Sequence, residues 1–273
     1  MTATSISAVI DHGKVSRQQY LIVGLCLLFN MIDGFDITAM AVTAHQIDEE
    51  LQLGAEQLGL VFSFSLAGMM LGAMFIASLS DVLGRRVIII TSLGLVGLTV
   101  SLTATIDSLS LLIALRFLSG LGAGAMLASV ATIAAEYSPE KYRAFCVTAV
   151  TAGYPLGATL TGLVANQIVP EFGWRSMFLL GGSLAILFTF IALWFIPESI
   201  QFLCSKKPPL ALEKINGILI KLARSPLKEL PIIDPYTQST TADTQNVLEK
   251  MMSLLTPKFR SATLRLWLTV FLC

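Results

Sequence analysis

The first long apolar stretch of the chain, Tyr20–Val42, reads YLIVGLCLLFNMIDGFDITAMAV. It is long enough to cross a bilayer core of about 30 Å as a helix. Two carboxylates, Asp33 and Asp36, stand near its centre, where a lipid-facing helix would carry leucine. An ionisable side chain at this depth costs roughly 2.5–3.5 kcal/mol on insertion scales, so both acids need a partner or a cavity. Their spacing places them on one helix face, which predicts a membrane-spanning helix with a polar stripe.

This polar stripe, which Asn30 extends by one turn, has two interpretations. It is either a buried hydrogen-bond network that holds helices together or a proton or substrate site that faces a water-filled cavity. Acidic residues inside a membrane favour the second interpretation, because an ionisable group there is rarely retained without a function.

The composition describes a membrane protein, with 55% apolar and only 13% charged residues, whereas soluble domains carry about 25% charged residues. Six membrane spans are predicted, and a seventh apolar run opens near Leu264 and continues to Cys273. The scattered cysteines and the two histidines have no metal-ligand or redox spacing, so we expect no metal site and no cofactor. The six predicted spans are Tyr20–Val42, Leu58–Ser80, Val87–Ile106, Leu109–Ala134, Phe145–Val169 and Trp174–Phe195.

Lysine and arginine gather in the connections on one side of the predicted bundle, while the opposite loops are acidic, with Arg175 as their one basic residue. The positive-inside rule therefore predicts four segments. They are a cytoplasmic N-terminal segment (1–19), a six-helix bundle (20–196), a cytoplasmic central loop (197–262) and the start of a seventh helix (263–273). Within the loop, Leu210–Arg224 has the pattern of an amphipathic helix. It either lies on the inner membrane surface or packs on the bundle.

Arg116 is the candidate counter-charge of the two acids. It lies seven residues into the fourth span, roughly 10 Å below the outer edge of the bilayer core. Asp33 lies roughly 20 Å above the inner edge and so at nearly the same height. We expect the cation and the acids to meet, as a cavity lining whose guanidinium clamps a substrate carboxylate or as a structural ion pair.

A second group of charged residues is predicted at the cytoplasmic helix ends. The turn after the second span and the connection after the fourth span each bring acids and bases together. We expect these groups to form a charge network, although positive-inside flanking alone would explain the two arginines of the turn. The predicted network consists of Asp81, Gly84, Arg85, Arg86, Glu136 and Arg143.

These stretches resemble the major facilitator superfamily. Residues 77–86, ASLSDVLGRR, resemble its signature Gly-x-x-x-Asp-Arg-x-Gly-Arg-Arg, with Ala77 and Val82 in place of the first glycine and the first arginine. Residues 136–143 resemble the companion pattern Glu-x-x-Pro-x-x-x-Arg. Residues 33–36, DGFD, are similar to the Asp-Gly-x-Asp signature of the aromatic acid:proton symporters.

The resemblance implies an all-α membrane protein, of which this chain supplies the N-terminal six-helix half of a twelve-helix fold and the start of a seventh helix. A C-terminal six-helix half would be its partner, with the substrate between the halves. The chain is then a fragment or a natural truncation. In one half alone, we expect Asp33, Asp36 and Arg116 to face lipid or an unsatisfied groove. We expect the substrate and proton residues to line the cavity between the halves. They are Asn30, Asp33, Asp36, Arg116 and Tyr154.

The resemblance further implies proton-coupled uptake of a benzoate-type aromatic acid across the cell inner (plasma) membrane. The proton gradient would be the driving force, and the protein would have no enzymatic activity, catalytic residue or nucleic-acid partner. Three alternatives stay open: a carrier for another organic anion, a carrier for a sugar, and a truncated, non-transporting remnant. An intramembrane aspartyl protease is disfavoured, because Asp33 and Asp36 lie on one helix and cannot share a proton as a catalytic pair does.

Overall fold

Six long apolar helices dominate the structure. The computed structural model describes residues 15–222 and 224–227, all within the first of two compact units, Met1–Ile233. These residues contain no β-strand, and each long helix is apolar enough to cross a membrane. The six are α2 (Arg17–Leu51), α3 (Ala55–Leu71) continued through the π-helical turn η1 (Gly72–Ile76) into α4 (Ala77–Leu83), α5 (Arg85–Thr103), α6 (Leu109–Tyr137), α7 (Glu140–Phe172) and α8 (Arg175–Phe195).

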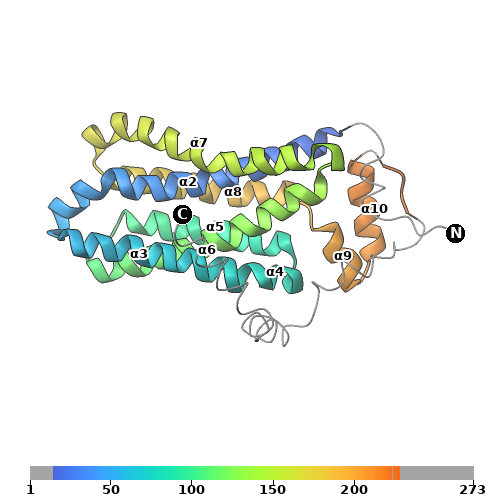
Figure 1. Ribbon diagram of the computed structural model, residues 1–273, viewed down its shortest axis with the longest axis horizontal. Coiled ribbons are helices and arrows are strands. Elements are labelled where there is room, and N and C mark those ends of the chain that lie inside the picture. The colour runs from blue at the N-terminus through green and yellow to red at the C-terminus, as the bar shows by residue number, and fades with distance from the viewer. Residues whose placement is uncertain (1–14, 223, 228–273) are drawn as a thin grey trace, which may run out of the picture. The chain divides into compact units, whose positions relative to one another are not determined.

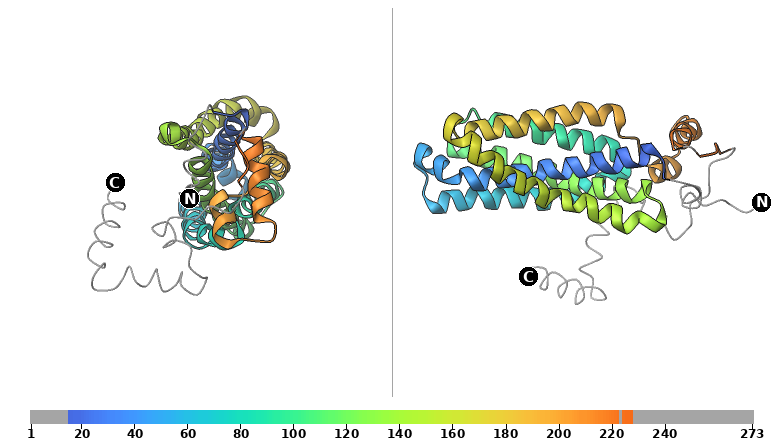
Figure 2. Two further views of the ribbon diagram at one scale, coloured as in Figure 1. Left: turned by 90° about the vertical axis from the view of Figure 1, so that its right-hand side faces the viewer. Right: turned by 90° about the horizontal axis from the view of Figure 1, so that it is seen from above.

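The long helices lie side by side in one bundle (Figure 1). Helix α2 packs mainly on α7, α3 on α6, and α5 between α6 and α8. Two short helices, α9 (Ile200–Lys206) and α10 (Ala211–Lys221), lie at the end of the bundle where α2 begins and α8 ends (Figure 2). We call this the α10 end, and we call the opposite end, where α2 gives way to α3, the Glu50 end.

Local sequence signals set the helix boundaries. Ser16 and Gln19 form a capping box at the start of α2: the Gln19 N–H donates to Ser16 Oγ (3.3 Å) and the Ser16 N–H donates to Gln19 Oε1 (2.8 Å). Gly84 separates α4 from α5 with φ of 99°, a conformation that side chains disfavour. Helices α2, α6, α7 and the continuous α3–α4 segment extend beyond the predicted apolar spans, because their polar end turns continue the helix outside the bilayer-length window. Helix α5 ends three residues before its predicted span does, and α8 matches its predicted span to within one residue.

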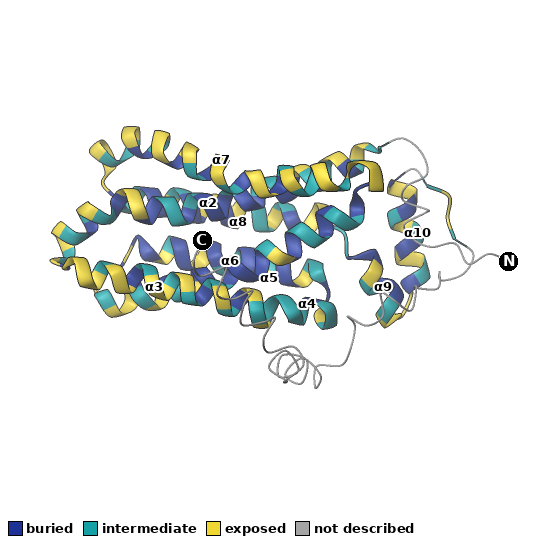
Figure 3. Ribbon diagram, viewed as in Figure 1, coloured by how far each residue is buried: buried dark blue, intermediate teal, exposed yellow. Residues whose placement is uncertain are grey.

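The burial pattern distinguishes inner from outer helices (Figure 3). About half of the most apolar window of α2, α5 and α6 is buried, whereas α3 and α7 leave most of their surface exposed. Large apolar side chains point outward from these helices and from α8, as a bilayer solvent requires. Examples are Leu66, Met70, Leu163, Phe190 and Trp194.

Glycines allow the closest helix contacts. A Cβ on Gly68 of α3 or on Gly72 of η1 would collide with a backbone carbonyl of α6, and a Cβ on Gly120 or Gly124 of α6 would collide with a carbonyl of α3. The two helices thus interlock through small residues four apart, a spacing typical of close helix contacts in membranes. Helix α7 continues through Pro155 without interruption.

Helix α10 confirms that the predicted amphipathic segment is helical, and its apolar face packs on the bundle. Ile215 and Leu219 are each 1% exposed and belong to the same apolar cluster as Ile22 and Tyr137 of the bundle. The protein therefore covers this face, and the exposed lysines of α10 remain at the surface. The predicted seventh span and most of the central loop lie outside the described residues.

Candidate functional site

The two acids of α2 lie inside the bundle rather than on its surface. Asp33 is 1% exposed and Asp36 is 4% exposed. The glycine between them, Gly34, lies so close to α7 that a Cβ would collide with the Tyr154 carbonyl oxygen. The absence of a side chain at Gly34 therefore lets α7 pack directly beside the acidic turn of α2.

Arg116 of α6 meets Asp36, as the depth comparison predicts. Its Nη1 donates to Asp36 Oδ1 over 2.7 Å, and its Nη2 donates to Thr103 Oγ1 of α5 over 2.9 Å. The guanidinium carbon lies 5.2 Å from the centre of the Phe178 ring on α8. One side chain, only 1% exposed, thus contacts α2, α5 and α8. Charge-assisted hydrogen bonds of this kind are strong where water is excluded.

Asp33 has a different environment from Asp36. Among the described residues, neither of its carboxylate oxygens has a hydrogen-bond partner. Arg116 Nε likewise has no acceptor within the described part of the chain. A buried carboxylate without a partner is costly while it is ionised. The site therefore contains one acid with a counter-charge and one without.

Two further predicted site residues contact the α2–α7 packing surface. Asn30 Nδ2 donates to the Val150 carbonyl of α7 over 2.8 Å, while its Oδ1 has no partner among the described atoms. Tyr154 is partly buried on α7, with its backbone carbonyl against Gly34. Asn30 thus helps to hold the two helices together beside the acids.

The expectation that one half alone leaves the acids and Arg116 facing lipid or an unsatisfied groove is wrong about exposure, although Asp33 does lack a hydrogen-bond partner among the described residues. All three residues are covered by the six-helix bundle itself. The physical reason is that α5 and α8 close over the guanidinium with Thr103 and Phe178, which sequence spacing does not reveal. In this conformation the charged set is therefore closed off from the surface of the bundle.

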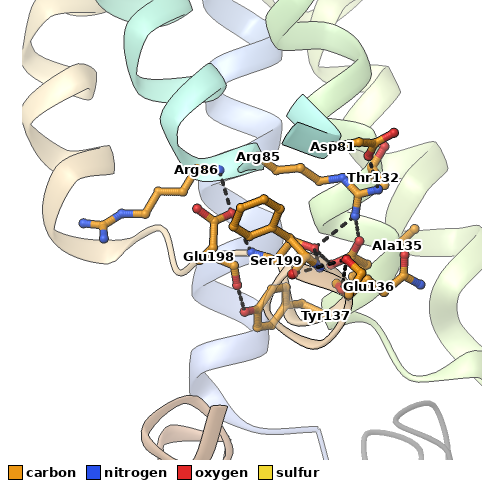
Figure 4. A network of polar contacts seen from close by, with 12 residues as sticks. Asp81, Arg85, Arg86, Thr132, Ala135, Glu136, Tyr137, Glu198 and Ser199 are labelled. Atoms are coloured by element: carbon orange, nitrogen blue, oxygen red, sulfur yellow. Dashed lines mark hydrogen bonds and ion pairs between the residues drawn. The ribbon is translucent and has the colours of Figure 1, made fainter. Parts of the chain in front are cut away.

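A second group of charged residues meets at the α10 end, with Arg85 at its centre (Figure 4). Arg85 Nη1 forms an ion pair with Glu136 of α6 and also donates to Ser199 Oγ (3.1 Å). Its Nη2 lies 3.4 Å from Asp81 Oδ1. Ser199 Oγ in turn donates to Glu136 Oε2 over 2.6 Å. These four residues, which we call the Arg85 network, join α4, α5, α6 and the start of α9.

The structure adds Glu198 and Ser199 to the group that the sequence predicts. Glu198 Oε1 accepts the backbone N–H groups of Arg86 (3.1 Å) and Ser199 (2.9 Å), and its carbonyl accepts the Tyr137 hydroxyl at 2.6 Å. Its Oε2 occupies the space that a Cβ on Gly84 would need. The sequence pattern that could have identified both residues is the motif Pro-Glu-Ser after the sixth span, since it places an acid and a capping serine at this helix end.

Two residues of the predicted charge network, Arg86 and Arg143, lie outside the Arg85 network. Arg86 Nη2 donates to the Leu193 carbonyl at the end of α8 (2.6 Å), away from Glu136 (Figure 4). Consecutive helical residues project about 100° apart, so Arg85 and Arg86 face different neighbours. Arg143 Nε donates to the Ala135 carbonyl (3.2 Å), where a cation stabilises the C-terminal turn of α6. Within the described residues, the ion pairs to Asp81 and Glu136 come from Arg85.

The Glu50 end has a polar group of its own, which sequence patterns do not reveal. Arg175 forms an ion pair with Glu50 and another with Asp107 (2.7 Å), and it lies 4.5 Å from the Trp174 ring. Trp174 Nε1 donates to Glu50 Oε2 over 2.6 Å. These contacts tie the end of α2 to two connecting loops. No group of three potential metal-ligating side chains gathers within residues 15–222 and 224–227.

The chain is similar to known transporters in sequence and in fold. A sequence model described as Major Facilitator Superfamily matches residues 25–272. The chain is 31% identical over 265 residues to the 4-hydroxybenzoate transporter PcaK of Acinetobacter baylyi, covering 97% of this chain and 57% of that protein. It is 30% identical over 268 residues to a gallate transporter of Pseudomonas putida, covering 96% and 57%.

Among solved structures, the xylose transporter XylE from E. coli in an inward-open conformation is similar, with a TM-score of 0.62 and 19% identity. The alignment covers 88% of this chain and 57% of that one. At this identity the likeness concerns the fold. The chain spans little more than half the length of these relatives, in agreement with a six-helix half.

Proposed function

Because the chain belongs to the major facilitator superfamily, we propose that it forms part of a secondary transporter that takes up an aromatic carboxylate together with protons. Relatives described as 4-hydroxybenzoate and gallate transporters support this substrate class. The observation that carries the proposal is the buried charged set: Asp36 paired with Arg116, and Asp33 one turn away without a partner among the described residues.

Asp33 is the residue we assign to the coupling proton. Two carboxylates and one guanidinium share this interior, so the set carries an excess negative charge while both acids are ionised. A proton taken up from outside removes that charge and the desolvation cost of an unpaired carboxylate. An acid without a permanent cationic partner also takes up a proton more readily than an ion-paired acid does, because no cation stabilises its carboxylate.

Arg116 is the residue we assign to the substrate carboxylate. A guanidinium recognises a carboxylate through two parallel N–H donors. Its Nε has no acceptor among the described residues. The guanidinium therefore retains a donor for an incoming acid, while the ring of Phe178 lies beside it. Coupling follows, because a proton on Asp33 lowers the negative charge of the set and so favours entry of an anion beside the cation.

The Arg85 network is assigned to gating. It fastens the α10 ends of several helices through a guanidinium that contacts Asp81, Glu136 and Ser199. We expect these contacts to form in the outward-open state and to separate when the halves rock. Because Glu136 is largely buried, breaking its pair requires a new partner or water.

We assign the protein to the cell inner membrane with the α10 end in the cytoplasm. Basic residues concentrate at the α10 end and acidic residues at the Glu50 end. The C-terminal six-helix half would be the partner, and the exposed faces of α3 and α7 offer surfaces for it. The proton gradient supplies the driving force, and no cofactor is required.

Uptake by cells that express the full reading frame containing this chain tests the proposal. Labelled 4-hydroxybenzoate should accumulate under an inward proton gradient, and a protonophore should abolish the accumulation. Unlabelled benzoate-type acids should compete, whereas xylose should not. Accumulation that survives the protonophore would contradict proton coupling, and competition by xylose alone would contradict the substrate class.

A further inference from the structure

Arg86 is one of two charged motif residues, with Arg143, that lie outside the Arg85 network. Its Nη2 donates to the Leu193 carbonyl at the end of α8 over 2.6 Å, and its Nε has no partner among the described residues. The side chain points away from Glu136 and toward α8 (Figure 4). It is therefore a cation held in place at the α10 end with no carboxylate bonded to its guanidinium in the described part of the chain.

A pocket of about 350 Å³ lies against this arginine. Helix α10 forms one wall with Lys214 and Lys221, two turns apart and both exposed. The single acid of the lining, Glu198, has its Oε1 engaged by the backbone N–H groups of Arg86 and Ser199. Three cations thus share the pocket with one acid, which makes its electrostatic potential positive.

The pocket lies at the boundary between membrane and water. Trp194, in the last turn of α8, lines it and is 84% exposed. Exposed tryptophan at a helix end is typical of the lipid headgroup level. Phe195 adds a second apolar surface to the lining, beside the cations. A molecule with a negative headgroup and an apolar tail matches both parts of this lining.

We propose that this pocket binds the headgroup of an anionic phospholipid from the leaflet at the α10 end. Its phosphate would lie among Arg86, Lys214 and Lys221, and its acyl chains would run along the lipid-facing surface near Trp194. Basic pockets beside membrane helices recognise such headgroups. A soluble phosphate would gain nothing from the apolar lining, which is why the lipid is favoured. The proposal does not depend on the transported substrate.

The pocket offers a steric test that leaves the charges intact. Gly217 of α10 lines it, and a Cβ at Gly217 would meet no atom within 4 Å. A Cβ at this position therefore has room, and the indole of Gly217→Trp would add bulk to the pocket lining. A matched charge control is available at the same end, because Lys206 and Lys207 are exposed and lie outside the lining.

Native mass spectrometry of the purified protein encoded by the full reading frame tests the proposal. The detergent-solubilised protein is titrated with phosphatidylglycerol, with phosphatidylcholine and with glycerol 3-phosphate. Phosphatidylglycerol should bind most tightly. Lys214→Gln with Lys221→Gln should weaken it roughly thirtyfold, about fivefold for each lysine. Gly217→Trp should abolish the tightest site, and Lys206→Gln with Lys207→Gln should leave its affinity unchanged. Unchanged lipid-free unfolding temperatures establish that the variants fold.

Three results would overturn the proposal. An equal affinity for phosphatidylcholine would show that charge is not recognised. An equal loss in the Lys206 and Lys207 control would reduce the effect to general surface charge. Glycerol 3-phosphate binding as tightly as the lipid, and blocked by Gly217→Trp, would identify the pocket as a site for a soluble phosphate.

Discussion

Arg116 Nη1 donates to Asp36 Oδ1 over 2.7 Å, joining α6 to α2 at a point where both side chains are almost fully buried. The same guanidinium donates to Thr103 of α5. Asp33, one turn before Asp36, receives no hydrogen bond from any described residue. Two acids on one helix face thus have different partners, and we infer that they have different roles.

The geometry of Arg116 predicts that a positive charge at this position is not enough for uptake, and that the planar guanidinium itself is needed. In Arg116→Lys, a single ammonium cannot reproduce the planar fork that holds Asp36 and Thr103 together, so we expect uptake to fall roughly tenfold or more. Arg116→Ala should be worse and should destabilise the protein by about 3–5 kcal/mol, because a buried acid loses its counter-charge. Uptake assays and thermal unfolding measure the two effects.

A double variant supplies the control for this pair. Arg116→Ala combined with Asp36→Ala should unfold at a higher temperature than Arg116→Ala alone, because no unpaired charge remains at the pair. Full activity of Arg116→Lys would show that Arg116 has only a structural role.

Gly34 predicts a steric effect at the acidic turn. In Gly34→Ala, the new Cβ would collide with the Tyr154 carbonyl and push α7 away, so we expect a destabilisation of about 1–3 kcal/mol and loss of uptake. Gly24→Ala is the matched control on the same helix, because nothing lies within 4 Å of its Cβ position. If both variants unfold at the same temperature, the close α2–α7 contact is not important.

The Arg85 network predicts unequal effects of its two acids. Asp81 is 37% exposed at the side chain and 3.4 Å from Arg85, so Asp81→Asn should slow transport while leaving substrate affinity within a few-fold. Glu136 is 5% exposed and bonded to both Arg85 and Ser199, so Glu136→Gln should slow transport more. Transport rates and competition binding separate the two quantities. A large affinity loss with normal cycling in Asp81→Asn would contradict a gating role.

The charge asymmetry of the helix ends predicts the topology. A cysteine introduced at Lys206 should be protected from a membrane-impermeant thiol reagent in intact cells, and a cysteine at Glu56 should react. A cysteine at position 240, beyond the described residues, should be protected as well. Cys26 is fully buried, and burial raises the pKa of Cys204 to about 11, so these native thiols add little background. Cys146 and Cys273 are replaced by alanine. Strong labelling at Lys206 or at position 240 would contradict the assigned orientation.

Residue patterns predicted much of this arrangement. Apolar length located the six spans, and simple rise per residue brought Arg116 and the acids to one depth, which the Asp36 ion pair confirms. Glycines four apart are a pattern typical of close helix contacts, and the α3–α6 interface has such contacts. These successes rest on helix geometry, which is regular enough to calculate from sequence.

Other features depend on how helices rotate against one another, which sequence spacing leaves open. Thr103 and Phe178 look like ordinary span residues until α5 and α8 are placed beside Arg116. Helix geometry makes Arg85 and Arg86 point in different directions, but no local pattern shows which neighbours they meet. Trp174 and Glu50 lie far apart in the chain and meet only through the packing of α2 and α8.

The central claim is that Asp33 carries the coupling proton, and Asp33→Asn tests it most directly. The variant is compared with wild type in proteoliposomes containing the protein from the full reading frame, using labelled 4-hydroxybenzoate. We predict that Asp33→Asn abolishes accumulation driven by an imposed pH gradient but retains exchange of labelled for unlabelled substrate, because the amide cannot release a proton while Arg116 still binds the anion. Normal gradient-driven accumulation in Asp33→Asn would contradict the account and leave Asp33 with a structural role.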